Sequence, residues 1–174
     1  MANATASAFL HNLDCLGFRP SLHAKGAFAN ISFTADIFTR LADNNKAFEA
    51  TSHFLFEKLN PARARTHFRH CWPIIHYTSQ SRLYRLAAFH WLQELKRQNH
   101  LPAHILLRRS YLEDCHGQHM NDLMLAFSNY VLKAVQERKK AHTTFVPSID
   151  ASGTGDKDTG IKQTTIPSSA KDRN

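Results

Sequence analysis

Residues 79–98 read SQSRLYRLAAFHWLQELKRQ, and this stretch decides the fold class. When its residues are placed 100° apart, the apolar side chains gather on one broad side of a helix. That side carries Leu83, Tyr84, Ala87, Ala88, Trp91, Leu92 and Leu95. The other side carries Arg82, Arg85, Gln93, Lys96 and Arg97, with Phe89 among them. The pattern predicts a helix that buries its apolar side and exposes a basic stripe.

The segments on either side also repeat apolar residues at helical spacing. A glycine or proline ends several of them, as at Gly17 and Asn60-Pro61. We expect helices at about residues 9–16, 34–41, 44–59, 62–70, 79–98, 103–112 and 118–140. No segment alternates apolar and polar residues for long enough to predict a strand. The predicted class is therefore all-α.

The last 34 residues differ in composition from the rest of the chain. Residues 141–174 are rich in Ser, Thr and Gly, and Phe145 is their only aromatic residue. Such a stretch cannot bury enough apolar surface to offset its chain entropy. We expect a compact helical domain over residues 6–140 and a disordered tail over 141–174.

The net charge of +8 belongs to the predicted domain, because residues 141–174 carry equal numbers of cations and anions. Between Lys58 and Arg109 ten residues are basic, and Glu94 is the only acid. A surface with this charge attracts an anionic partner, such as nucleic acid, an acidic membrane or the acidic face of a microtubule. A solvated face that only maintains solubility would have the same composition.

Motifs for catalysis and cofactor binding are missing from the sequence. It has no GxxxxGK[ST] or GxGxxG loop, no nucleophile elbow, no HExxH and no CxxC. It also has no signal peptide and no apolar run long enough to cross a bilayer. Three widely spaced cysteines are typical of reduced thiols in the cytosol or nucleus. We expect a soluble intracellular binding protein, not an enzyme, without cofactor, membrane or small-molecule substrate.

Two groups of histidine and cysteine could form a zinc site, because each places two metal ligands on one helix face. They are His67, His70 and Cys71, and Cys115, His116 and His119. Structural zinc sites usually contain at least two cysteines at tight spacing, which this chain lacks. Helix packing is the preferred interpretation, and we predict no metal.

Three blocks of sequence resemble one known family. They are LDCLGFRP at 13–20, AF at 47–48 followed by SHFLFEKLN at 52–60, and FRHCWP at 68–73. In this order and with similar gaps, they resemble the N-terminal domain of augmin-like complex subunit 6. The resemblance implies a calponin-homology-like helical fold and a non-catalytic subunit without a cofactor. Members of this family continue into long coiled coils, so we expect the chain to be a fragment or an aberrant gene product, or else a short relative.

The resemblance also implies partners. Augmin attaches to an existing microtubule and brings in the gamma-tubulin ring complex, so that new microtubules form in the mitotic spindle. The subunit 6 head packs beside the subunit 7 head, and such heads can contact the microtubule. The implied locations are the cytoplasm, the cytoskeleton and the spindle.

The helical wheel, and not the family motifs, supplies the candidate contact residues. For the acidic surface of tubulin or a partner subunit they are Arg82, Arg85, Phe89, Lys96, Arg97, Arg108 and Arg109. Two alternatives remain open. The first is a pure scaffold that binds a sister subunit through apolar surface such as Phe56 or Phe89. The second is a nucleic-acid-binding domain, although the pattern of a recognition helix after a tight turn is missing.

Overall fold

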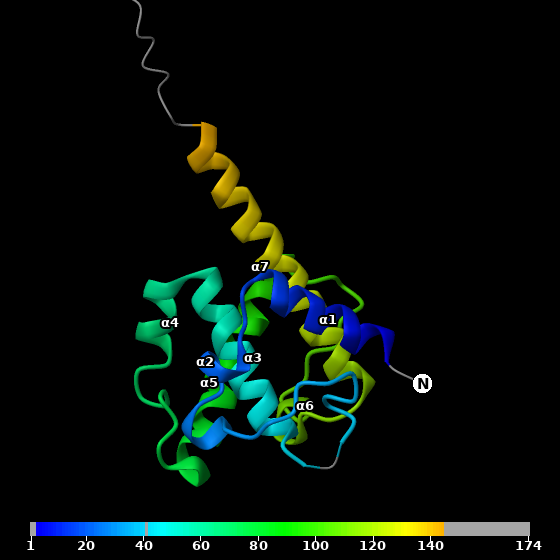
Figure 1. Ribbon diagram of the computed structural model, residues 1–174, viewed down its shortest axis with the longest axis vertical. Helices are drawn as coiled ribbons and strands as arrows, with labels where there is room; N and C mark the ends of the chain where they lie inside the picture. The colour runs from blue at the N-terminus through cyan, green and yellow to red at the C-terminus, as the bar shows by residue number, and fades with distance from the viewer. Residues whose placement is uncertain (1–2, 41, 145–174) are drawn as a thin grey trace, which may run out of the picture.

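The computed structural model describes residues 3–40 and 42–144, and over this part of the chain it contains helices, turns and loops but no strand (Figure 1). The all-α prediction is therefore confirmed. The elements are α1 (Ala4–Cys15), α2 (Pro20–His23), the 3₁₀ turn η1 (Gly26–Phe28), α3 (Asn44–Leu59), α4 (Pro61–His67), α5 (Tyr77–Arg97), α6 (Tyr111–Asp114) and α7 (Gln118–Thr144).

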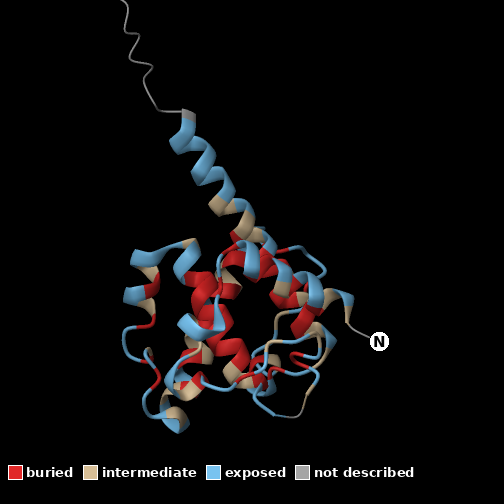
Figure 2. Ribbon diagram, in the orientation of Figure 1, coloured by how far each residue is buried: buried red, intermediate tan, exposed pale blue. Residues whose placement is uncertain are grey.

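Helix α3 lies at the centre of the domain (Figure 2). Every residue from Ala47 to Phe56 is buried, because α4, α5, α6, α7 and η1 all pack against this helix. A helix enclosed on all sides must be apolar or internally bonded around its whole circumference. Phe56 is fully buried, so the predicted use of Phe56 as a partner contact is wrong.

A cluster of aromatic rings joins α3 to its neighbours. The ring of Phe56 lies 4.5 Å from that of Trp91 on α5 and 4.8 Å from that of Phe127 on α7. Phe68, just after α4, lies 4.8 Å from Tyr84 on α5. Aromatic pairs at these separations contribute about 0.5–1.5 kcal/mol each beyond their burial. The cluster fixes the positions of three long helices relative to one another.

Helix α5 buries a narrower side than the wheel predicted. Tyr84, Ala88, Trp91, Leu92 and Leu95 are buried as expected. Leu83 was expected in the core, but 53% of it is exposed. At 100° per residue it lies roughly 120° from the middle of the buried side, which places it on the solvent side of the helix.

The predicted helix over residues 34–41 is wrong, because the described part of this segment forms turns. Phe38 has a left-handed φ of 66°, which an α-helix does not accommodate. Its carbonyl instead accepts a hydrogen bond from the backbone of Gly117, at 2.7 Å. Ile37 and Phe38 are nevertheless buried, so the apolar residues were correctly recognised as core.

The predicted helix over residues 103–112 is also wrong. Only the short helix α6 forms, and it begins at Tyr111 and ends where Cys115 takes a left-handed φ of 47°. The preceding segment is held from outside, because the Lys96 ammonium donates a hydrogen bond to the carbonyl of Ile105. Ile105 and Leu112 are buried, so the segment is anchored by side chains in place of a helical ladder.

Helix α7 packs against α1 and α3 through a seam of buried side chains. The seam consists of Met120, Leu123, Met124, Phe127 and Val131. The helix then projects away from the body and continues to Thr144 (Figure 1), beyond the predicted end of the domain at residue 140. The rest of the predicted tail, residues 145–174, lies outside the described residues.

Candidate functional site

The loop and short helix after α5 lie along its side, and together they form one surface. At one end of this contact, the Lys96 ammonium binds the carbonyl of Ile105. At the other end a small depression is lined by Arg82, Arg85, Leu86, Arg109, Leu112 and Glu113. Residues 105–113 therefore run back along α5, and they bring Arg109 beside Arg82 and Arg85 of that helix.

Four arginines of this surface are exposed: Arg82, Arg97, Arg108 and Arg109. We refer to these four residues as the α5 basic face. Arg97 donates a hydrogen bond to Gln93 at 3.0 Å, and the guanidinium of Arg108 lies 5.8 Å from the ring centre of Tyr111. Within residues 3–40 and 42–144, none of the four forms an ion pair. Their charges are therefore available to a partner.

Arg85, in contrast, points into the domain. Its Nη1 atom donates to Glu49 Oε1 at 2.7 Å and to Ser81 Oγ at 2.5 Å. Only 11% of the Arg85 side chain is exposed, and Glu49 is fully buried. Burial raises the pKa of Glu49, while the bonds from Ser81 and Arg85 act in the opposite direction. Arg85 therefore neutralises a buried carboxylate and offers little surface to a partner.

The other two candidate residues also contribute to packing. The Lys96 ammonium is partly buried and donates a hydrogen bond to the carbonyl of Ile105. Phe89 is partly buried against the hydrophobic core. Of the seven predicted contact residues, four are therefore exposed at the surface. The other three, Arg85, Lys96 and Phe89, make contacts within the domain.

Two exposed apolar side chains belong to the same elements as the α5 basic face. Leu83 on α5 is 53% exposed, and Leu106 in the following loop is 55% exposed. Sequence reasoning missed both as surface residues, since it placed Leu83 in the core and predicted a helix around Leu106. The position of Leu83 on the wheel was the available signal. A partner of this surface would bury apolar as well as charged groups.

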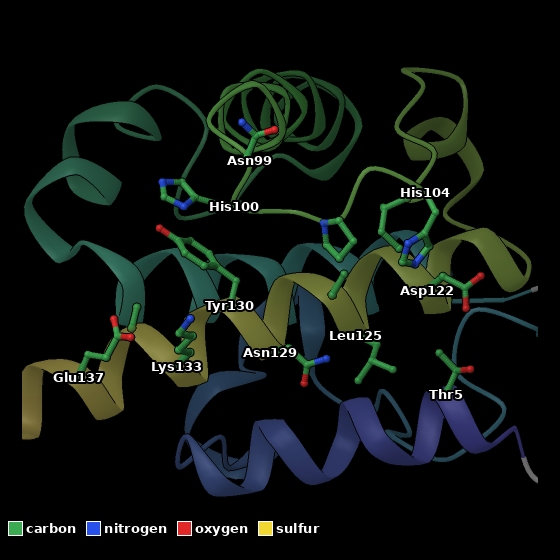
Figure 3. A pocket seen from close by; sticks show the side chains of 14 residues that line it. Thr5, Asn99, His100, His104, Asp122, Leu125, Asn129, Tyr130, Lys133 and Glu137 are labelled. Atoms are coloured by element: carbon green, nitrogen blue, oxygen red, sulfur yellow. The ribbon is translucent and has the colours of Figure 1, made fainter.

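A larger groove lies elsewhere, between α1, α7 and the loop after α5 (Figure 3). Its volume is about 870 Å³, and Asp122, Lys133 and Glu137 all contribute to its lining. His100 stacks on Tyr130 at one side, with 4.6 Å between ring centres. None of the candidate contact residues lines this groove. Because it carries both charge signs, its lining does not select for an acidic partner.

The residues considered for zinc have other contacts. His67 bonds the carbonyl of Ala87 at 2.9 Å, His116 lies 3.2 Å from the Asn44 amide, and His119 packs on Tyr111. Burial raises the pKa of Cys71 to about 11, and it also raises that of Cys115. Across the described chain, three or more potential ligands do not converge on a point that could hold a metal ion.

These features define a basic, all-helical domain. The helices that the structure describes include none that is long and apolar enough to cross a membrane. The sequence profile of the HAUS augmin-like complex subunit 6 N-terminus matches residues 9–166, so the chain belongs to this family. Its members are non-catalytic subunits of a complex, which confirms the predictions of family and of a role other than catalysis.

A zebrafish (Danio rerio) relative shows how much of a longer protein this region represents. HAUS augmin-like complex subunit 6 of that species is 30% identical over 138 residues. The matched region is 79% of this chain but 17% of the relative. The chain therefore corresponds to a small part of that relative's length.

Proposed function

We propose that this domain is a binding head of an augmin-like complex and docks on the acidic surface of the microtubule through the α5 basic face. In this role it would contribute to microtubule-dependent microtubule nucleation and spindle assembly. The observation that carries the proposal is the set of four exposed arginines without an ion pair in the described structure. One acid, Glu113, lines the same depression as Arg82 and Arg109, but it forms no ion pair with either arginine in the described structure.

The strength of such docking follows from its exposure to solvent. Each exposed ion pair contributes only about 0.2–1 kcal/mol and weakens as salt is added. A single head would therefore bind weakly, with an association rate raised by its positive field. Useful affinity would come from several contacts made within one complex.

The family suggests further partners for the rest of this proposal. The other augmin subunits, and the subunit 7 head in particular, would lie beside the domain. The gamma-tubulin ring complex would be recruited through the complex and not by this head. The protein would then act in the cytoplasm, on the cytoskeleton and at the spindle. The calponin-homology-like relationship of the fold also remains a prediction.

A second candidate function is supported by the exposed Leu83 and Leu106. If these apolar side chains pack on a sister subunit, the domain would be a scaffold and its arginines would surround that contact. Substitution of the four arginines would then leave microtubule binding unchanged. Substitution of Leu83 and Leu106 by Ser would weaken assembly with the sister subunit.

Co-sedimentation with stabilised microtubules over a series of salt concentrations tests the proposal. In the test variant the four arginines of the α5 basic face are replaced by Glu. The control variant carries the same charge change at four exposed cations elsewhere, Lys25, Arg65, Arg69 and Lys133. We expect salt-sensitive binding that the test variant loses and the control keeps.

Equal losses in the two variants would show that only net charge matters, and this would overturn the assignment of the face. No loss in either variant would favour the scaffold function. Tighter binding of the unmodified domain to duplex DNA at the same salt would favour the nucleic-acid alternative.

A further inference from the structure

We propose that Ser110 is a phosphorylation site for an arginine-directed protein kinase, and that the phosphoryl group switches off the α5 basic face. This inference rests on the proposed function for its consequence but not for the modification itself. It concerns a hydroxyl that lies next to two of the four exposed arginines in the sequence.

Ser110 is accessible in a segment with little regular structure. It is exposed and stands at the start of α6, where its side chain makes no capping hydrogen bond. The four residues before Ser110 include the exposed Leu106, Arg108 and Arg109. Few backbone hydrogen bonds must open for this stretch to enter a kinase cleft, and they are turn contacts such as Tyr111 N to Arg108 O.

The arginines before Ser110 are available for recognition by a kinase. A kinase that selects basic substrates presents acidic side chains, and guanidinium groups pair well with carboxylates. Arg108 and Arg109 occupy the two positions before the serine, and neither forms an ion pair within the described residues. The hydroxyl and its recognition groups are therefore exposed together.

Other hydroxyls that follow an arginine differ in this respect. Ser21 has Arg19 two residues before it, but Arg19 pairs with Asp14 at 2.6 Å. Thr66 directly follows the exposed Arg65, but Arg63, three residues before it, pairs with Glu94 at 2.6 Å. The Thr66 hydroxyl also donates to the carbonyl of Ala62 within α4. Ser110 combines an unbonded hydroxyl with unpaired arginines.

The reaction is an ordinary phosphoryl transfer from a nucleoside triphosphate. The Ser110 Oγ atom bonds to the γ-phosphorus as the bond from that phosphorus to the β–γ bridging oxygen breaks. The nucleoside diphosphate leaves with that electron pair. The hydroxyl proton passes to the catalytic carboxylate of the kinase.

The product places about −1.5 to −2 charges at pH 7 beside the arginines. Phosphate oxygens form strong, often bidentate bonds with guanidinium groups. Arg109 and Arg82 line one depression, and Ser110 is the next residue in the sequence after Arg109, so we expect the phosphoryl group to engage both arginines. About half of the positive charge of the face would be cancelled. We expect about a tenfold loss of affinity for an acidic partner at low salt.

The modification is tested by incubating the full chain with magnesium, ATP and a kinase that selects arginine two residues before its target. Mass spectrometry then maps the phosphorylated residues. We expect phosphate on Ser110 in preference to Ser21, which also has an arginine two residues before it, and none at position 110 in the Ser110→Ala variant. Modification of Ser21 with Ser110 left unmodified would overturn the assignment.

The switch is tested on chains with phosphoserine incorporated at position 110 or, as a control with equal charge, at the exposed Ser7 on α1. We expect the first chain to bind microtubules about tenfold more weakly than the second. Equal binding by two chains that both bind would overturn the switch.

A phosphorus NMR titration separates this inference from the proposed function. Capture by guanidinium groups lowers the second pKa of a phosphoserine, which is about 6 when unpaired. We expect a lower value at position 110 than at position 7, and its return to the ordinary value in the Arg82→Gln/Arg109→Gln variant. Failure of the unmodified chain to bind microtubules would overturn the proposed function alone. Equal pKa values of the phosphoserine at positions 110 and 7 would overturn the contact between the phosphoryl group and the arginines, whether or not the chain binds microtubules.

Discussion

Glu49 and Arg85 form an ion pair inside the domain, with 2.7 Å between Oε1 and Nη1, and this contact joins α3 to α5. Ser81 completes it by donating to the same carboxylate oxygen at 2.5 Å. The basic surface of α5 therefore depends on a buried acid of the central helix for its orientation.

Removal of Arg85 should destabilise the domain strongly. Arg85→Ala would leave the Glu49 carboxylate buried without its cation, at a cost of about 3–5 kcal/mol. Arg82→Ala, on the exposed face of the same helix, should change the free energy of unfolding by less than about 0.5 kcal/mol. Urea unfolding of the two variants measures the difference. Similar small effects would contradict the burial of Arg85.

His53 should make the domain sensitive to acid. It is buried, and its ring stacks on Trp72 with 3.7 Å between centres. Burial lowers the pKa of His53 from 6.5 to about 3, so the folded state keeps the imidazole neutral. The unfolded chain binds the proton more readily than the folded chain. The contribution of the neutral His53 to the free energy of unfolding is therefore fully present above pH 6.5, and it is lost progressively as pH falls toward 3.

The variant His53→Phe keeps an aromatic ring against Trp72 and removes the titration. We expect its unfolding free energy to fall less between pH 7 and pH 5 than that of the unmodified chain. His70→Gln, at an exposed position, serves as the control. The same pH dependence in His53→Phe and the unmodified chain would exclude His53 as the source of the acid sensitivity.

Leu83 and Leu92 should respond differently to truncation, although both are leucines on α5. Leu92 is fully buried, so Leu92→Ala should cost about 2–5 kcal/mol. Leu83 is 53% exposed, so Leu83→Ala should cost less than about 0.5 kcal/mol. Thermal unfolding of the two variants checks the prediction. A large loss of stability in Leu83→Ala would show that Leu83 is part of the core after all.

The three cysteines should differ in their reaction with a thiol reagent. Cys15 is exposed, whereas Cys71 and Cys115 are buried with raised pKa values. The thiolate is the reactive form, so burial and a high pKa both slow the reaction. We expect one rapid equivalent of labelling in the folded chain, absent in Cys15→Ser, and two more after denaturation. Rapid labelling of Cys71 or Cys115 would show that the core opens.

The sequence predicted the helices that have long periodic patterns. The buried side of α5, the seam of α7 and the burial of Ile37 and Phe38 all followed from apolar spacing. The two wrong helices lie where the backbone is bonded by distant groups, as between Phe38 and Gly117 or between Ile105 and Lys96. Local spacing contains no information about such partners, so it predicted helix in both places.

The candidate site shows the same limit. The wheel identified Arg82 and Arg97 as exposed cations, since exposure depends mainly on position around the helix. It did not reveal that Arg85 turns inward, because Glu49 is 36 residues away. A single acid within the apolar run of α3 was the only signal, and its meaning depends on how two helices pack.

The projection of α7 has a geometric consequence for the exposed end of this helix. The helix is uninterrupted from the buried Val131 to Thr144, so its rotation is set by the core. Arg138 supports it from the side by donating to the carbonyl of Lys58 at the end of α3. One residue inserted after Lys140 would turn the following side chains by about 100° and advance them by about 1.5 Å. The orientation of any partner that binds residues 141–143 is therefore fixed relative to the α5 basic face by the rotation of this helix.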